Sequence, residues 1–364
     1  MFGKSNAALT ERDVLDALKG VKDPDIGRDL VDLGMIKDIR IGEGTVALMV
    51  NLTTPACPLK AQIERDVRNA LQGRLGGEWT FQITMGSEVR GKGVAETGDI
   101  PGIKNVIAVG SGKGGVGKST MAAAIAYGLR SYGARVGLMD ADVYGPSIPH
   151  LVGASGRPMA IGERIQPIEA NGLKLMSMGF LLEPDRAVIM RGPMLHGIIQ
   201  QFLRQVEWGP LDYLVIDLPP GTGDAQLSLA QSIPLSGGII VTLPQEVSLE
   251  DARRGLEMFR ELNVPILGVV ENMSYLEMPD GTRMDVFGTG GGQKLAEASK
   301  VPYLGQIPMD PAVRIGGDAG KPVIVAAPDS APARALRDLA EQIAARLSVA
   351  AIQSGQGVSI DMVG

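Results

Sequence analysis

The sequence predicts an α/β protein with a mostly parallel sheet, preceded by a small α+β domain. Three observations predict this fold class. From residue 103 to about 348, short apolar strand segments alternate with helical patterns, as in parallel sheets that helices cover on both faces. A glycine-rich stretch, residues 110–120, lies between the first of these strands and the next helix. Residues 1–92 instead combine a hairpin pattern with two amphipathic helices.

The small domain, residues 1–92, shows four local signals. Thr10 has the sequence context of a helix N-cap, and apolar residues follow it at helical spacing. Residues 35–50 read as two strands joined by a Gly-Glu-Gly turn, which predicts a hairpin. Residues 59–71 are an amphipathic helical pattern, and residues 79–84 alternate like a strand. A compact α+β unit is therefore expected.

The larger domain is expected at 103–348, after a Gly- and Pro-containing linker at 93–102. A closing helix is predicted over 331–347, and the small, polar residues 349–364 predict a flexible tail. The predicted strands of the sheet are 105–109, 136–139, 214–216, 238–242 and 266–270.

The glycine-rich stretch has the form G-x-x-x-x-G-K-S from Gly112 to Ser119, which is typical of a phosphate-binding loop. Its glycines permit a tight turn and leave backbone N–H groups open to phosphate oxygens, and the next helix adds the positive end of its dipole. We expect Lys118 to reach the β- and γ-phosphates and the Ser119 hydroxyl to bind Mg²⁺. The pattern predicts a P-loop NTPase domain whose nucleotide contacts are Gly112, Lys113, Gly114, Gly115, Val116, Gly117, Lys118, Ser119 and Thr120.

Two further strands are predicted to end in carboxylates. Asp217 ends one apolar strand and precedes a Gly- and Pro-rich turn, where it suits the water shell of Mg²⁺. Asp140 and Asp142 end another strand, and paired carboxylates there suit metal coordination and the orientation of an attacking water. The alternative for Asp217 is an ordinary residue between a strand and a loop, and the alternative for Asp140 and Asp142 is a solvated loop.

The composition indicates which binding partners and which cellular compartment to expect. The formal net charge of −6 argues against a nucleic-acid partner. No apolar run reaches the length of a membrane span, and the N-terminus lacks the apolar centre of a signal peptide. One cysteine, Cys57, excludes an intrachain disulfide. We therefore expect a cytoplasmic protein without a membrane partner.

Several motifs together resemble a known family. The extra lysine, Lys113, makes the phosphate loop similar to the deviant Walker A loop of the MinD/ParA/nitrogenase-iron-protein class of dimeric ATPases. Within that class, the chain resembles the Mrp/ApbC branch of iron–sulphur cluster carrier proteins, whose motifs it matches at residues 140–147, 190–194, 217–224 and 271–275. Residues 23–36 and 53–58 resemble the small domain that is often fused to bacterial members.

The resemblance implies a homodimer that binds ATP and Mg²⁺, hydrolyses ATP slowly, and carries iron–sulphur clusters to apoprotein clients. It implies that Lys113 reaches the nucleotide of the partner subunit and that Lys118 contacts the phosphates. Asp142 is expected to position the hydrolytic water, Asp217 to serve Mg²⁺, and Asn272 to contact the adenine. Solvated-loop and turn-forming roles are the alternatives for Lys113 and Asn272.

The chain departs from the family where the cluster would be bound. Carriers of this branch usually have a C-x-x-C pair after the 272–275 segment, and Met278 and Gly281 stand at those positions here. Two such pairs would supply the four thiolates of a [4Fe–4S] cluster. Cys57, just before a predicted helix, is the remaining thiol. A cluster or iron ligand, a redox-sensitive site, a partner contact and a small buried hydrophobe are its open alternatives.

Three other functions are alternatives for a protein with this loop. A membrane-positioning ATPase similar to MinD needs a basic amphipathic C-terminal helix, whereas residues 350–364 are acidic and contain glycine. A DNA-partitioning ATPase needs a basic surface that the composition does not indicate. An ATP-gated adaptor, whose small domain binds protein clients without a metal of its own, stays open.

Overall fold

The computed structural model describes residues 9–91, 100–182, 192–221 and 223–354. The chain divides into two compact units, one ending at Arg90 and the other beginning at Gly91, and each is described by itself. Most of the expected linker at 93–102 falls within residues 92–99, and the first two residues of the motif at 190–194 fall within residues 183–191. Both of these stretches lie outside the described residues.

The first unit is a three-stranded sheet covered by two helices. The predicted hairpin is confirmed, because its two strands pair antiparallel, and the third strand pairs parallel with the second. Thr10 caps the first helix through a capping box with Asp13, which confirms the predicted N-cap. The elements are β1 (Ile36–Gly42), β2 (Thr45–Leu52), β3 (Thr80–Ser87), α1 (Glu11–Leu18) and α2 (Lys60–Leu75).

One face of this sheet forms the core of the first unit. Side chains along β2 alternate between buried and half-buried, as expected for a sheet with one covered face. The helices contribute Val14, Leu18, Ile63, Val67 and Leu71, all of which are almost fully buried. The unit therefore has a hydrophobic core of its own.

The second unit is built on an eight-stranded sheet in the order β15-β12-β11-β4-β10-β5-β9-β8. Every neighbouring pair is parallel except β8 and β9, which confirms the predicted mostly parallel sheet. The strands are β4 (Ile103–Gly110), β5 (Val136–Asp140), β8 (Ile168–Ala170), β9 (Leu173–Ser177), β10 (Leu211–Asp217), β11 (Gly237–Thr242), β12 (Ile266–Glu271) and β15 (Tyr303–Gln306).

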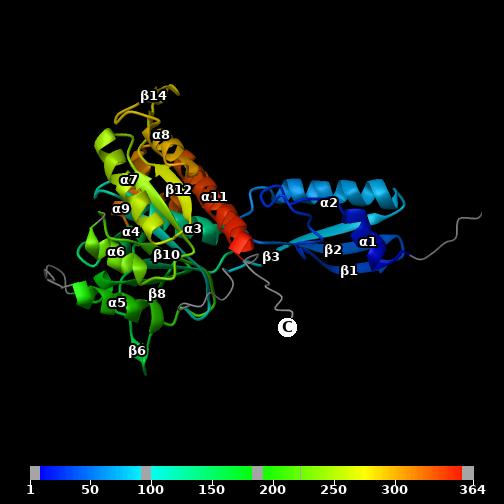
Figure 1. The fold of residues 1–364 in the computed structure, drawn as a ribbon, viewed down its shortest axis with the longest axis horizontal. Helices are drawn as coiled ribbons and strands as arrows, with labels where there is room; N and C mark the ends of the chain where they lie inside the picture. Colours follow the sequence, from blue (N-terminus) through cyan, green and yellow to red (C-terminus); the bar gives the residue numbers. More distant parts are fainter. Residues whose placement is uncertain (1–8, 92–99, 183–191, 222, 355–364) are drawn as a thin grey trace, which may run out of the picture. The chain divides into compact units, whose positions relative to one another are not determined.

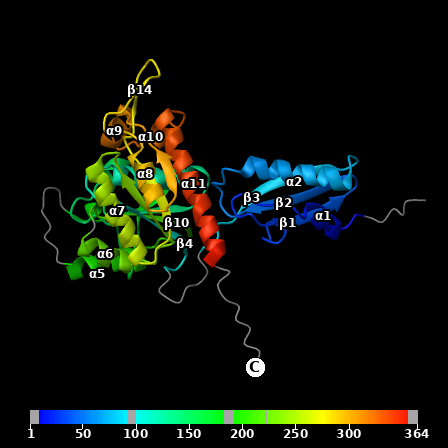
Figure 2. The same ribbon diagram turned by 45° about the horizontal axis from the view of Figure 1, so that its top comes forward.

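Helices cover both faces of this sheet (Figures 1 and 2). On one face, α5, α6, α7 and α8 share an apolar core with the strands. Helix α3 follows the glycine-rich stretch and packs with α11. The helices are α3 (Lys118–Ser131), α4 (Ile148–Val152), α5 (Gly192–Arg204), α6 (Asp224–Gln231), α7 (Glu246–Glu261), α8 (Gly291–Ala298), α9 (Pro311–Asp318), α10 (Val323–Ala326) and α11 (Ala331–Ser354).

Two small hairpins project from the second unit. One joins β6 (Ala160–Ile161) to β7 (Arg164–Ile165), and the other joins β13 (Leu276–Glu277) to β14 (Arg283–Met284). A short 3-10 helix, η1 (Met178–Phe180), follows β9. The second hairpin contains the positions at which the C-x-x-C pair was expected.

The structure differs from the sequence prediction at the margins of the sheet and at the end of the chain. Strands β8, β9 and β15 were not predicted, because they are short and lie at or near the sheet edges, where only pairing with a neighbour defines them. The closing helix does not end at Leu347 but continues to Ser354, and Ala351 is still buried there. Only residues 355–364 of the expected tail lie outside the described residues.

Candidate nucleotide-binding site

The predicted phosphate loop connects the end of β4 at Gly110 to the start of α3 at Lys118. Gly117 adopts a left-handed conformation with φ of 84°, which side chains disfavour. A Cβ at Gly112 would lie 2.6 Å from the backbone nitrogen of Ala252 and closer still to the carbonyl of Asp251. The loop therefore packs closely against the backbone of α7, and only glycine fits at the first position of the motif.

A buried ion pair connects the loop to the sheet. The Nζ atom of Lys118 lies 2.6 Å from Oδ1 of Asp217 at the end of β10, and 3.4 Å from the Ser119 hydroxyl. The Asp217 side chain is fully buried, and its Oδ2 has no hydrogen-bond partner among the described residues. An orphaned carboxylate oxygen costs free energy unless a ligand satisfies it. Asp217 and Ser119 therefore fit the hard oxygen donors that a magnesium site requires.

A second buried carboxylate lies on the neighbouring strand, because Asp217 of β10 and Asp140 of β5 are register partners. Burial, together with the charge of Asp217, raises the pKa of Asp140 to about 7. Burial also raises the pKa of Asp217, against the opposing effect of Lys118. The raised pKa values show that burial disfavours the charged form of both carboxylates, and a bound cation would favour it.

Neutral donors hold Asp140 in place. Its Oδ2 accepts hydrogen bonds from the Ser177 hydroxyl at 3.1 Å and the Ile148 backbone at 3.2 Å, and its Oδ1 accepts from the Asp142 backbone at 3.1 Å. Sequence reasoning missed Ser177, which ends the unpredicted strand β9. The sequence signal that could have identified Ser177 is a serine at the carboxyl end of a short apolar segment.

Asp142 and Lys113 lie nearer to solvent than the buried pair. Asp142 is half-buried, and its Oδ1 accepts a hydrogen bond of 3.2 Å from the Gly145 backbone. Lys113 is exposed, and its carbonyl accepts a 3.0 Å hydrogen bond from the Ser111 hydroxyl. Both side chains are therefore placed where they can meet a ligand or a second molecule.

Asn272 contacts the phosphate loop directly. Its Nδ2 donates a 2.9 Å hydrogen bond to the carbonyl of Val116 and lies against Gly117. Its expected contact with adenine stays a prediction. The preceding residue, Glu271, is fully buried at the end of β12 and was not singled out from the sequence.

The thiol and the family's cluster positions belong to different units. Cys57 is half-buried in the first unit, just before α2. Met278 and Gly281 lie in the turn of the β13–β14 hairpin, where the Gly281 N–H donates to the Met278 carbonyl at 2.9 Å. Within the part of the chain that the structure describes, no group of three or more His, Cys, Asp or Glu side chains could hold a metal ion.

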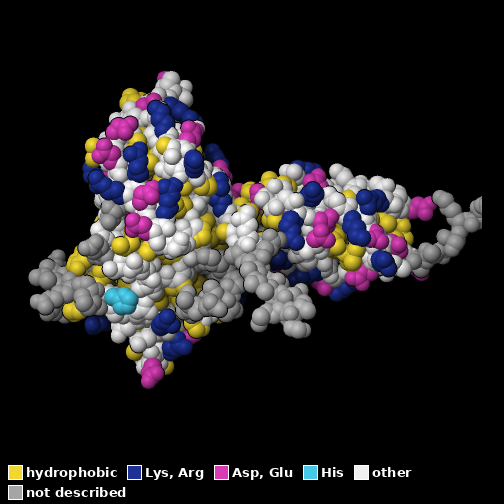
Figure 3. Space-filling model, viewed as in Figure 1, with side chains coloured by type: hydrophobic (Ala, Val, Ile, Leu, Met, Phe, Trp, Pro, Cys, Tyr) yellow, Lys and Arg dark blue, Asp and Glu magenta, His cyan; other side chains and the backbone are white. Residues whose placement is uncertain are grey.

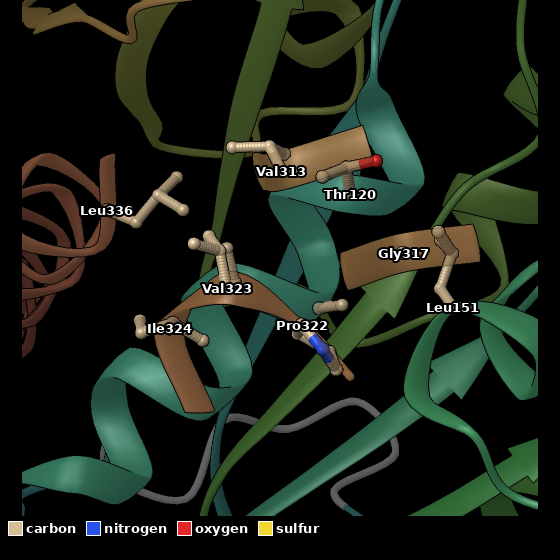
Figure 4. Close-up of a pocket in the computed structure, with 10 residues that line it drawn as sticks. Thr120, Leu151, Val313, Gly317, Pro322, Val323, Ile324 and Leu336 are labelled. Carbon is tan, nitrogen blue, oxygen red and sulfur yellow. The ribbon is translucent and has the colours of Figure 1, made fainter. Parts of the chain in front are cut away.

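A small cavity behind α3 is a packing feature and not the nucleotide site (Figure 4). Its volume is about 20 Å³, close to that of one water molecule, and its lining is almost entirely apolar. Thr120, in the first turn of α3, lines the cavity next to Val313, and Val323 and Leu336 line other parts of its wall (Figure 4). It is too small for a nucleotide.

On the face shown in Figure 3, basic and acidic side chains are interspersed across both units. Among the described residues, no helix is both long and apolar enough to cross a membrane.

Two protein-family models match the sequence of this chain. The model of the NUBPL iron-transfer P-loop NTPases matches residues 102–344, and that of an iron-sulfur cluster assembly protein family matches residues 11–80. The first match covers the whole phosphate site and more than half of the chain. The chain belongs to the NUBPL iron-transfer family of P-loop NTPases.

Individual relatives match over almost the whole length. An iron-sulfur cluster carrier protein of Synechocystis sp. is 49% identical over 351 residues, which are 94% of this chain and 99% of the relative. A carrier protein of Deinococcus radiodurans is 51% identical over 339 residues, or 92% of this chain and 95% of the relative.

Solved structures resemble the second unit. A nucleotide-binding protein from Archaeoglobus fulgidus in complex with ADP is 40% identical, with a TM-score of 0.55, and the match covers 61% of this chain and 88% of that protein. The cell-division ATPase MinD of Pyrococcus furiosus shares the fold at 23% identity, with a TM-score of 0.51 and coverage of 66% and 98%.

Proposed function

We propose that this chain is an ATP-binding and slowly hydrolysing carrier in iron–sulphur cluster assembly, which transfers clusters to apoproteins. The observation that supports nucleotide binding is the buried Asp217 carboxylate, with one oxygen paired to Lys118 and the other without a hydrogen-bond partner among the described residues. The cargo is proposed from the relatives named as cluster carriers.

The residues of the loop divide the work on ATP. Lys118 would exchange part of its contact with Asp217 for the β- and γ-phosphates, while the loop N–H groups cradle the phosphate oxygens. Ser119 and Asp217 would hold Mg²⁺, which neutralises charge that develops on the phosphates. Asp142 would orient the attacking water from the half-buried rim of the site.

We propose that two copies of the chain complete the site. Lys113 is exposed on the loop and is free to extend toward the phosphates of a partner subunit. Asn272 would reach the adenine from the end of β12. We expect light-scattering measurements to show a homodimer of the native protein with MgATP and no homodimer of Lys113→Ala. A monomer under saturating MgATP would contradict this part of the proposal.

Cluster binding must use unusual ligands in this chain. Each copy offers one thiol, Cys57, so two copies supply two of the four thiolates that a cubane cluster prefers. We propose that the missing ligands come from a client protein or a small thiol, and that the cargo is held at Cys57 only during transfer.

Anaerobic reconstitution with iron, sulphide and a small thiol tests this cargo. We expect visible absorbance and equal amounts of iron and labile sulphide on the native protein, and their loss in Cys57→Ser. Native protein that takes up neither iron nor sulphide, while still binding ATP, would overturn the carrier function.

The second candidate is an ATP-gated adaptor without a bound cluster. The observation that favours it is the β13–β14 turn, where Met278 and Gly281 replace the thiols and backbone hydrogen bonds close the hairpin. In that case ATP would control binding of protein clients. A positioning ATPase similar to MinD is the remaining alternative, which binding to lipid vesicles would reveal.

We also propose a cytoplasmic location and no nucleic-acid or membrane partner. The acidic net charge and the single cysteine support these proposals. Retention of the protein on DNA or on anionic vesicles at physiological salt would contradict them.

A further inference from the structure

The chain leaves the sheet after β12 and returns at the start of α8. Residues 275–289 between them, called the arm here, include the β13–β14 hairpin. In both ribbon views β14 lies in a projection beyond α8 (Figures 1 and 2). Met284 and Val286 of the arm are 50% and 45% exposed. The arm is therefore held mainly at its two ends.

Glu271 fastens both ends of the arm. Its carboxylate accepts hydrogen bonds from the Ser274 hydroxyl, just before the arm, and from the Gly290 and Gly292 backbones, just after it. The Gly290 and Gly292 bonds measure 3.0 and 2.5 Å. The two ends also meet directly, because the Ser274 and Thr289 hydroxyls lie 3.4 Å apart.

The next residue fastens the phosphate loop. Asn272 donates to the Val116 carbonyl at 2.9 Å, and the same side chain packs against Gly117. Because Gly117 immediately precedes Lys118, a change in the loop displaces Asn272 unless this bond breaks. Two consecutive residues thus hold the nucleotide loop on one side and the base of the arm on the other.

The electrostatics make this junction stiff. Glu271 is fully buried and forms no ion pair within the described parts of the chain. Its charge is met by neutral donors and by the positive end of the α8 dipole. Moving Ser274 or the first turn of α8 away from this carboxylate would leave it unsatisfied. These hydrogen bonds therefore oppose any displacement of the base of the arm relative to the end of β12.

We propose that Glu271 and Asn272 form a relay through which nucleotide loading of the phosphate loop changes the position of the arm. Glu271 is a positioning residue in this relay, since the hydrogen bonds of its carboxylate go to the base of the arm and the start of α8. The relay rests on the proposed nucleotide binding and deepens it, because it names the surface whose partner contacts ATP would control.

Hydrogen–deuterium exchange of the full chain tests the relay. Exchange of peptides that cover 275–289 is measured without nucleotide and with saturating MgATP, and binding is measured separately by titration. We expect MgATP to change arm exchange by about threefold or more in the native protein. Glu271→Gln replaces one acceptor oxygen by an NH2 group, which cannot accept from the backbone N–H donors. This variant should lose most of the difference in exchange at saturating MgATP.

Glu277→Gln is the matched control, because Glu277 is an exposed glutamate on the arm itself. It should keep the full response. If Glu271→Gln fails to fold, Ser274→Ala carries the same test, since it removes one donor and keeps the charge. A native arm that is unchanged at saturating ATP, or a folded variant that keeps the full response, would overturn the relay. Absence of ATP binding would instead count against the proposed function.

Discussion

At the scale of single residues, Lys118 has one charged partner in this structure and would gain a second in the proposed nucleotide complex. In this structure it neutralises the buried Asp217, and in the proposed complex it must reach the phosphates. The loss of Lys118 is therefore expected to affect the protein both with and without nucleotide.

We predict that Lys118→Ala weakens MgATP binding by more than about tenfold. It should also lower the free energy of unfolding of the nucleotide-free protein by roughly 3 kcal/mol, because it leaves a buried carboxylate unpaired. Fluorescence titration and denaturant unfolding measure the two effects. Unchanged affinity for MgATP would refute the assignment of the phosphate loop.

Gly112 and Gly114 form a matched pair for the packing of the loop. A Cβ at Gly112 would enter the backbone of α7, whereas a Cβ at Gly114 would have its nearest neighbour, Pro220 Cβ, at 4.0 Å. We predict that Gly112→Ala lowers the free energy of unfolding by about 1–3 kcal/mol. Gly114→Ala should be nearly neutral in the same thermal or urea unfolding experiment. Equal effects of the two substitutions would show that the loop is not packed as described.

At the scale of elements, Asp212 joins three segments at the amino ends of the strands. It lies at the start of β10 and binds Arg135, just before β5, at 3.0 Å and Lys104 of β4 at 3.2 Å. Burial alone would raise the pKa of Asp212, but the hydrogen bonds from Arg135 and Lys104 outweigh it and lower the pKa. The ionised carboxylate therefore stabilises the register of the central strands.

The sign of the pH dependence follows from this lowered pKa. The native carboxyl binds its proton at lower pH than the unfolded one does, so its contribution is complete above the unfolded pKa of about 3.8 and is lost below it. We predict that Asp212→Asn costs about 1 kcal/mol at pH 7, after allowance for solvent screening at the exposed Arg135. The cost should shrink as the pH falls below about 4.

Urea unfolding of both proteins across this pH range measures the difference. Asp318→Asn is the control, because its pair with Arg314 is exposed on both sides and should contribute almost nothing at any pH. A cost of Asp212→Asn that stays constant with pH would contradict the electrostatic explanation.

At the scale of the whole molecule, each unit has its own core, and the whole phosphate site lies in the second unit. We predict that residues 91–364, produced without the first unit, bind MgATP within about twofold of the full chain. Because Cys57 lies in the first unit, the same fragment should take up no iron–sulphur cluster under reconstitution. A fragment that folds but loses nucleotide affinity would show that the first unit contributes to the site.

Much of the site could be predicted from sequence because its parts are local. The loop over 110–120 follows a strand and begins a helix, so Lys118 and Ser119 were expected in one place. Asp217 and Asp140 were each expected at the end of a strand, and the structure makes them register partners, since the carboxyl ends of parallel strands lie at one edge of the sheet. The strands at or near the sheet edges were not predicted, because a short strand such as β9 is defined by its pairing with β5 and β8.

The sequence by itself determined the parallel fold, the phosphate loop and the absence of the paired cysteines, because these depend on residue type, spacing and local periodicity. Only the tertiary structure decided that Asp217 pairs with Lys118 while its other oxygen has no hydrogen-bond partner in the described parts of the chain, and that α7 packs against Gly112. It also brought Glu271 against the start of α8 and Asn272 against the loop. Such contacts join residues far apart in the chain. The packing of several elements buries Asp217, Lys118 and Glu271, and burial strengthens the electrostatic interactions of their charges.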